Sequence, residues 1–163
     1  MKTIIGLLLI WSSFTFAGVL KYETLCKGND CFKNGWTTIG TNFRLETECK
    51  KQDCSRYGWS SVANDNSTYE VNCQIGGCFK MGWHSVQNIK GKKFHDSVTC
   101  KFGSCLNYGW TVATGYDLMG GNVQCYGNDC SKYGGTSFWR GRPSQTACYS
   151  KDCYHRGWTL LVY

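Results

Sequence analysis

Twelve cysteines divide this chain into six copies of one short motif. The two cysteines of a copy are separated by four residues, and in five of the six copies Gly-Trp follows the second cysteine after three more residues. The copies recur every 23 to 27 residues, a period typical of repeat architectures. A unit of this length cannot bury a hydrophobic core alone, so neighbouring copies must share one.

The cysteine spacing predicts a disulfide inside each copy. The gap within a copy is always four residues, whereas the gap between copies varies from 17 to 21. A constant gap beside a variable one indicates that each bridge closes its own copy, with a stabilisation of about 2 kcal/mol per bridge. Zinc held by thiolates of neighbouring copies is the alternative. The expected bridges are Cys26–Cys31, Cys49–Cys54, Cys73–Cys78, Cys100–Cys105, Cys125–Cys130 and Cys148–Cys153.

Residues 1–17 have the pattern of a secretory signal peptide. Lys2 supplies the positive start, residues 4–11 are apolar, and Thr15-Phe16-Ala17 is a small-residue cleavage site. The apolar run is shorter than the ~20 residues that span a bilayer, and no second apolar span follows. We therefore expect a secreted, extracellular protein whose residues 18–163 form a single domain. Secretion also disfavours zinc, because an even cysteine count in an oxidising compartment is typical of disulfides.

Two patterns of apolar and β-branched residues predict two strands per copy. A β-branched residue stands two positions before each first cysteine, which places both on one face of a strand. An apolar residue stands eight positions after each second cysteine, which indicates a second strand with this residue on its buried face. The first set is Thr24, Thr47, Val71, Val98, Val123 and Thr146; the second is Ile39, Val62, Val86, Ala113, Phe138 and Leu161.

The residues between the two strands predict a single helical turn. A capping-type residue precedes each second cysteine, and glycine follows that cysteine after three residues, as expected for a turn that ends in a left-handed glycine. The capping positions are Asp30, Asp53, Gly77, Ser104, Asp129 and Asp152. We interpret the four aspartates of this set as structural rather than as catalytic groups or calcium ligands.

The sequence therefore predicts an all-β fold of six tandem, disulfide-stapled β-hairpins of about 24 residues. Such hairpins either close into a pseudo-symmetric ring or stack as an open solenoid. An open stack needs polar end caps, whereas Gly18-Val19-Leu20 and residues 159–163 are apolar. The apolar ends favour closure.

The tryptophans of the repeat are the first candidate ligand-binding residues. If the apolar residue three positions later lines the core, the indoles form an outer stripe with neighbouring basic side chains. Such a stripe would suit sugar rings, cationic head groups or protein partners. In the other arrangement, each indole is the hydrophobic centre of its own hairpin. The residues concerned are Trp36, Trp59, Trp83, Trp110 and Trp158, with Lys33, Arg56, Lys80 and Lys132.

Copy five departs from the repeat and supplies a second candidate. Gly135 replaces the expected tryptophan, and Trp139-Arg140-Gly141-Arg142-Pro143 follows. We include Trp139, Arg140 and Arg142 among candidate ligand-binding residues. Sequence drift in one copy is the alternative explanation.

Catalytic, metal and nucleic-acid signatures are weak. The three histidines lie in different copies, and the chain has no nucleophile elbow, metal triad or phosphate loop, so we expect a non-enzymatic protein without a cofactor or metal. Basic residues are spread over the copies apart from Lys90-Gly91-Lys92-Lys93, which disfavours nucleic acid. Asn66-Ser67-Thr68 is an N-glycosylation sequon in a polar run, so glycosylation of Asn66 is expected.

The features together favour a secreted, non-enzymatic binding module for an extracellular glycan, cell-surface or protein ligand. A structural or protective secretion is the alternative, and a toxin or inhibitor is the second. The hairpin followed by Gly-Trp resembles the aromatic repeats of bacterial cell-wall-binding modules in architecture. Those repeats lack paired cysteines, so the resemblance implies no site residues here.

Overall fold

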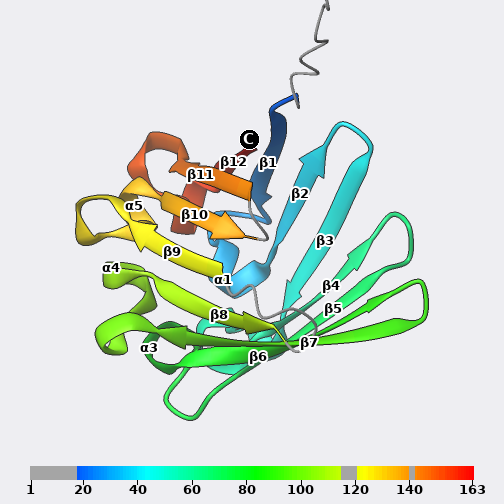
Figure 1. The fold of residues 1–163 in the computed structure, drawn as a ribbon, viewed down its shortest axis with the longest axis horizontal. Helices are drawn as coiled ribbons and strands as arrows, with labels where there is room; N and C mark the ends of the chain where they lie inside the picture. The colour runs from blue at the N-terminus through cyan, green and yellow to red at the C-terminus, as the bar shows by residue number, and fades with distance from the viewer. Residues whose placement is uncertain (1–17, 115–120, 140–141) are drawn as a thin grey trace, which may run out of the picture.

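Twelve antiparallel strands form a closed barrel in the computed structural model, which describes residues 18–114, 121–139 and 142–163, with Trp139 by its backbone alone. Each strand pairs with its neighbours in sequence, and β12 pairs back with β1 (Figure 1). Leu20 lies opposite Val162 at this closure. The closed assembly is thus confirmed and the open solenoid is excluded. The expected signal peptide lies outside the described residues.

Each copy contributes two strands on either side of its cysteine pair, as predicted. The strands that end at a first cysteine are β1 (Leu20–Cys26), β3 (Phe43–Cys49), β5 (Thr68–Cys73), β7 (Lys92–Cys100), β9 (Gly121–Cys125) and β11 (Arg142–Cys148). The strands that return are β2 (Trp36–Gly40), β4 (Trp59–Ala63), β6 (Gly82–Ile89), β8 (Trp110–Thr114), β10 (Gly135–Trp139) and β12 (Trp158–Val162).

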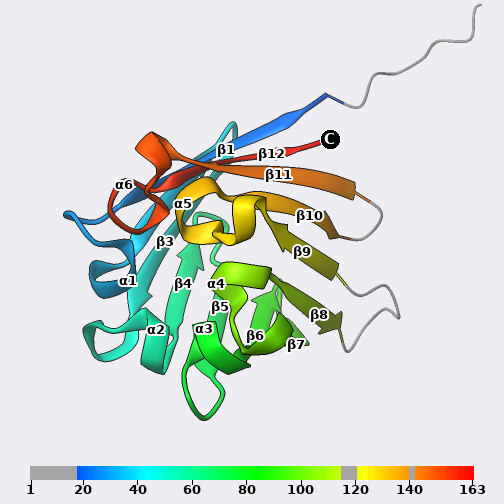
Figure 2. The ribbon, with the colours of Figure 1, turned by 90° about the vertical axis from the view of Figure 1, so that its left-hand side faces the viewer.

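Short helical turns gather at one end of the barrel (Figure 2). They are α1 (Cys31–Asn34), α2 (Cys54–Tyr57), α3 (Cys78–Met81), α4 (Cys105–Tyr108), α5 (Cys130–Tyr133) and α6 (Cys153–Arg156). The 3₁₀ turns η1 (Lys50–Gln52), η2 (Lys101–Gly103), η3 (Tyr126–Asn128) and η4 (Tyr149–Lys151) precede four of them. None of the helices in the described ranges has the length and apolar character needed to cross a membrane.

Side-chain caps begin five of the six turns, which confirms the capping prediction. Asp30, for example, accepts hydrogen bonds from the backbone N–H groups of Phe32 and Lys33 at 3.0 Å. Asp53, Ser104, Asp129 and Asp152 cap their turns in the same way. The exception is Gly77, which has no side chain to accept a bond.

The glycine that ends each turn has a positive φ, as predicted, but it is not in the left-handed helical region. At Gly82, φ is 114° and ψ is −162°, in a region open essentially to glycine alone. A Cβ on Gly82 would lie 2.0 Å from the carbonyl oxygen of Val98 in the next copy. The glycine is therefore required by both its backbone angles and the closeness of the following strand.

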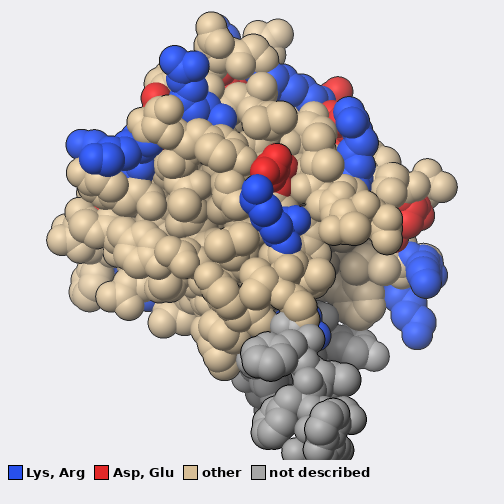
Figure 3. Space-filling model, turned by 90° about the horizontal axis from the view of Figure 1, so that it is seen from above, with Lys and Arg blue, Asp and Glu red and all other residues tan. Residues whose placement is uncertain are grey.

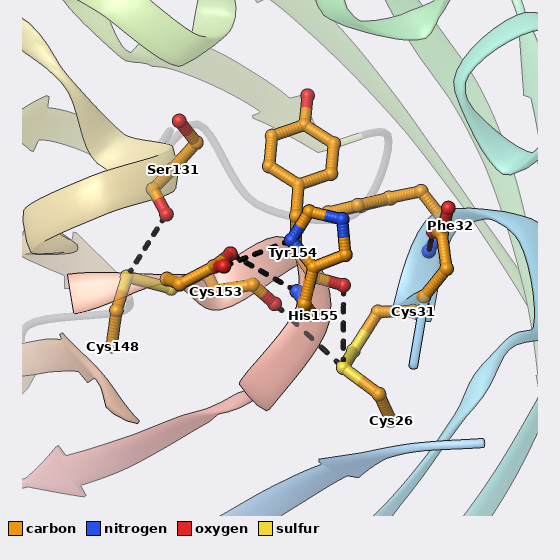
Figure 4. Close-up of polar contacts among 10 residues, drawn as sticks. Cys26, Cys31, Phe32, Ser131, Cys148, Cys153, Tyr154 and His155 are labelled. Carbon is orange, nitrogen blue, oxygen red and sulfur yellow. Dashed lines mark hydrogen bonds and ion pairs between the residues drawn. A yellow bond between two sulfur atoms is a disulfide. The ribbon is translucent and has the colours of Figure 1, made fainter. Parts of the chain in front are cut away.

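All six predicted disulfides are present, so the zinc alternative is excluded. The sulfur of each first cysteine also contacts backbone carbonyl oxygens of the preceding turn. Cys26 Sγ lies 3.4 Å from the carbonyl oxygen of Tyr154 across the barrel closure (Figure 4). A disulfide sulfur has no proton to donate, so these are packing contacts that join the six bridges and turns into one ring.

The inner face of the barrel is set by the tryptophans and the β-branched residues that precede the cysteines. Trp36 lies directly opposite Cys26 and Thr47, and Thr24 and Thr47 are buried. Thr24 Oγ1 pairs with Thr38 Oγ1 at 2.9 Å, and Thr47 Oγ1 pairs with Ser61 Oγ at 2.8 Å. These paired hydroxyls satisfy each other inside the barrel.

The expected core positions on the returning strands are wrong. Ile39 and Val62 are 40% and 51% exposed and lie on the outer wall of the barrel, and Phe138 is 53% exposed. Trp36 is three residues before Ile39, so the two side chains point to opposite faces of β2. The larger indole takes the inner face because its burial removes more apolar surface from water.

Candidate functional site

Five indoles form an incomplete ring inside the barrel, next to the helical turns. Trp36 contacts Trp59 and Trp158 with ring centroids 5.6 and 5.7 Å apart, and Trp83 contacts Trp59 and Trp110 at 5.7 Å each. The rings are tilted by 56° to 60° from one neighbour to the next. We call this set the indole ring. The structure thus brings all five predicted tryptophans together, facing inward.

The repeat explains why the indoles converge. Each tryptophan follows the positive-φ glycine and opens the returning strand, so six equivalent strands present this position at one level of the barrel. Trp36 is only 7% exposed and packs with the disulfide cysteines Cys31 and Cys54. The other four indoles are partly exposed, because the ring surrounds a hollow.

The ring is open at copy five, where Gly135 occupies the tryptophan position between Trp110 and Trp158. A Cβ on Gly135 would lie 2.3 Å from the carbonyl oxygen of Gln124 on β9. No side chain fits there unless β9 and β10 separate. The gap therefore depends on the backbone positions of β9 and β10 in copy five. Sequence drift at residue 135 alone does not account for it.

A cluster of aromatic side chains covers the turn end of the ring. Phe32 lies 4.8 Å from Phe79 and 4.5 Å from Tyr154 between ring centroids. Burial, followed by the charges of Asp129 and Asp30, raises the pKa of Tyr154 to about 12. Phe32, Phe79 and Tyr154 directly follow the second cysteine of their copies, and the equivalent residue of copy five is Ser131. Copy five therefore lacks an aromatic side chain both in the indole ring and in the cluster that covers it.

The missing indole and the small Ser131 leave an apolar cavity of about 260 Å³ inside the barrel. Its walls are the indole ring with Phe32, Phe79 and Leu106, and its copy-five side is formed by Ser131, Gly134, Gly135, Ser137 and Thr146. An apolar cavity of about 150 Å³ binds benzene. This cavity has room for a bicyclic aromatic ring or a short alkyl chain.

A second, more polar cavity of about 650 Å³ adjoins the first toward the opposite end of the barrel. The two cavities share Trp110, Val123 and Ser137 in their walls. Asp96 is 8% exposed in the second cavity and accepts a 2.6 Å hydrogen bond from Gln87 Nε2. An apolar group in the first cavity would therefore have polar side chains within reach of its far end.

The basic candidates lie apart from the indoles. Lys33, Arg56, Lys80 and Lys132 lie on the helical turns rather than alternating with the tryptophans on one strand face. Arg56 and Lys132 stack on the adjacent Tyr57 and Tyr133 at 5.4 and 5.2 Å. On the face shown in Figure 3, basic side chains are dispersed, and one near the centre lies beside an acidic side chain.

Arg142 and Asn66 lie toward the opposite end of the barrel from the turns. Arg142 begins β11, opposite the backbone of Trp139, and lines the polar cavity. Arg140 and the Trp139 side chain lie outside the described part of the structure. Asn66 is exposed in the turn between β4 and β5 with φ of 63°, and its glycosylation remains a prediction.

Several residues of the cavity were not predicted as site residues. Phe32, Phe79 and Ser131 occupy the position after the second cysteine, which varies between aromatic, aliphatic and serine and so shows no repeat signal. Gly135 was noted as an exception, but its contact with Gln124 is visible only in three dimensions.

Within the described ranges, no three or more His, Cys, Asp or Glu side chains come together as metal ligands. Comparisons of the chain with family models, curated proteins and solved structures give no match. The functional argument therefore rests on the cavity and its walls. Six disulfides in a domain of this size are consistent with an extracellular protein.

Proposed function

We propose that this protein is a secreted, non-enzymatic binding module that holds a small, largely apolar ligand inside its barrel. The observation that carries the proposal is the gap in the indole ring at Gly135, which leaves an aromatic cavity of about 260 Å³. Aromatic walls with a few polar groups are typical of small-molecule sites. In this protein the polar groups are Ser131, Thr136, Ser137 and Thr146.

The inward orientation of the indoles favours an internal ligand over a surface glycan. Sugar rings stack on exposed aromatic faces, whereas Trp36 is buried and its neighbours face the hollow. A purely structural protein would gain stability from a sixth indole or a larger residue at Ser131. Copy five instead has small residues at both positions that border the cavity.

A matched pair of substitutions tests the proposal. Ser131 and Ser55 occupy the same position in copies five and two, and each hydroxyl donates a 2.6 Å hydrogen bond to its capping aspartate, Asp129 or Asp53. Only Ser131 lines the aromatic cavity. Ser131→Phe should fill the cavity, whereas Ser55→Phe loses the same hydroxyl without lining it.

We expect the purified protein to bind 2-naphthol or decanoate, measured by calorimetric titration. Ser131→Phe should weaken this binding by at least about tenfold, or about 1.4 kcal/mol, while Ser55→Phe retains it. Thermal midpoints of both variants verify folding. Equal loss of probe binding in the two variants would show that the change in the turn, and not filling of the cavity, weakens binding. Binding of chitin oligosaccharides but of neither probe would show that the ligand is a glycan and would contradict the proposal.

A further inference from the structure

Charge is distributed unevenly between the two ends of the barrel. We call residues 27–34, 50–57, 74–81, 101–108, 126–133 and 149–156, which contain the turns, the turn end. It has ten lysines and arginines against four aspartates, whereas the rest of the chain from Gly18 onward has seven residues of each sign. The turn end therefore accounts for the whole net positive charge of residues 18–163.

The acidic groups of the turn end are used within the fold. All four aspartates cap helical turns, and Asp53 and Asp129 accept backbone and serine hydrogen bonds through Oδ1. Lys27 pairs with Glu46 and Glu48, and Lys50 pairs with Glu70. The excess of cations remains after these pairs are counted.

The same end has a one-sided set of exposed apolar side chains on copies three to five. We call this set the apolar arc; it consists of Ile75, Met81, Phe102, Tyr108, Tyr126 and Tyr133. Ile75 is 98% exposed and Phe102 is 89% exposed. The residues equivalent to these two in the other copies are Gly28, Lys51, Gly127 and Ser150, so the repeat does not require an apolar side chain there.

The side chain of Phe102 contributes little to the stability of the fold. Its φ is 48°, a region that is unfavourable for a bulky side chain, and its ring has an edge contact with Tyr108 at 5.5 Å. The loop of Ile75, between β5 and α3, projects from the molecule at the lower edge of Figures 1 and 2. Exposed apolar residues that the repeat does not require, one of them in an unfavourable backbone conformation, indicate a contact made outside the molecule.

We propose that the apolar arc inserts into the headgroup region of an anionic lipid bilayer. Ile75 and Phe102 would enter the interface, and the exposed Lys80 and Lys132 of copies three and five would lie against the lipid phosphates. Apolar side chains bordered by lysines are typical of segments that bind the membrane interface. A rigid protein partner would need a separate pocket for each projecting side chain, whereas a fluid bilayer accommodates both.

Vesicle flotation tests this proposal with the whole protein. We expect binding to vesicles of phosphatidylcholine and phosphatidylserine, less binding at higher salt, and little binding to phosphatidylcholine alone. The double variant Ile75→Ser/Phe102→Ser should bind on the order of tenfold more weakly or less. The matched control Ile39→Ser/Val62→Ser changes exposed residues of the outer wall and should bind as the native protein does.

Stability separates a binding role from a structural one. Phe102→Gly suits the positive φ, so it should keep or raise the thermal midpoint while weakening vesicle binding. Unaltered vesicle binding by the double variant would overturn the proposal. Binding to soluble heparin without vesicle binding would assign the basic end to a sulfated glycan and would overturn it as well. Ser131→Phe should leave vesicle binding unchanged. The proposed internal ligand site and the proposed bilayer contact are therefore tested independently.

Discussion

Trp36→Ala is expected to lower the free energy of unfolding by about 3–5 kcal/mol. Trp36 is the most buried of the five indoles, and its ring contacts those of Phe32, Trp59 and Trp158. Removing it would enlarge the existing hollow and interrupt the indole ring at a second place. Denaturant unfolding with the disulfides intact, followed by far-ultraviolet circular dichroism, measures the change.

Phe138→Ala is the control for this substitution. Phe138 is also a large aromatic residue on a returning strand, but it is 53% exposed. Its loss should change the free energy of unfolding by about 1 kcal/mol or less. Equal effects of the two substitutions would contradict an inner face set by the indoles.

Gly82→Ala is expected to cost about 3 kcal/mol or more of unfolding free energy. The new Cβ would meet the carbonyl oxygen of Val98 at 2.0 Å, so β6 and β7 would have to separate at their first pair. The backbone angles of Gly82 are also unfavourable for any residue with a Cβ. Thermal unfolding of the variant, with disulfides intact, tests this.

Gly91→Ala is the comparison variant in which the new methyl group meets no neighbouring atom. Gly91 has φ of 79° in the turn between β6 and β7, but no heavy atom beyond its chain neighbours lies within 4 Å of the position that an alanine methyl group would take. This control should therefore lose only about 1–2 kcal/mol, the cost of the left-handed conformation. If Gly82→Ala were no worse than Gly91→Ala, the close approach of the next copy would not be what requires glycine.

The disulfide-stapled hairpins could be predicted from the sequence because each of their determinants is local, whereas closure joins residues far apart in the sequence and was only favoured by the apolar ends. The cysteine gap specifies the bridge, the capping residue begins the turn, and a glycine ends it. These signals recur six times, so each copy supports the interpretation of the others.

The orientation of the strands could not be predicted as readily. On β2, Trp36 and Ile39 point to opposite faces, and both are apolar. The alternation of side chains along β2 therefore does not show which face is the inner one. The inner face is decided by how much apolar surface the barrel can bury at each position. The indole side is selected because six equivalent positions meet inside the closed ring, which is a property of the whole assembly.

The cavity was predictable only in part. Gly135 is visible in the sequence as an interruption of the repeat, and the tryptophans were candidates from the start. The contribution of Ser131 was hidden, because its position varies between copies. The exposed Ile75 and Phe102 were equally hidden, because apolar composition alone does not distinguish a core residue from one that projects into solvent.

The most direct test of the proposed internal site is nuclear magnetic resonance of the labelled protein with 2-naphthol. A ligand in the gap of the indole ring should give intermolecular nuclear Overhauser effects to the indoles of Trp110 and Trp158 and to the Thr146 methyl group. Effects confined to outer-wall or turn-end residues such as Val62 and Phe102 would contradict an internal binding site.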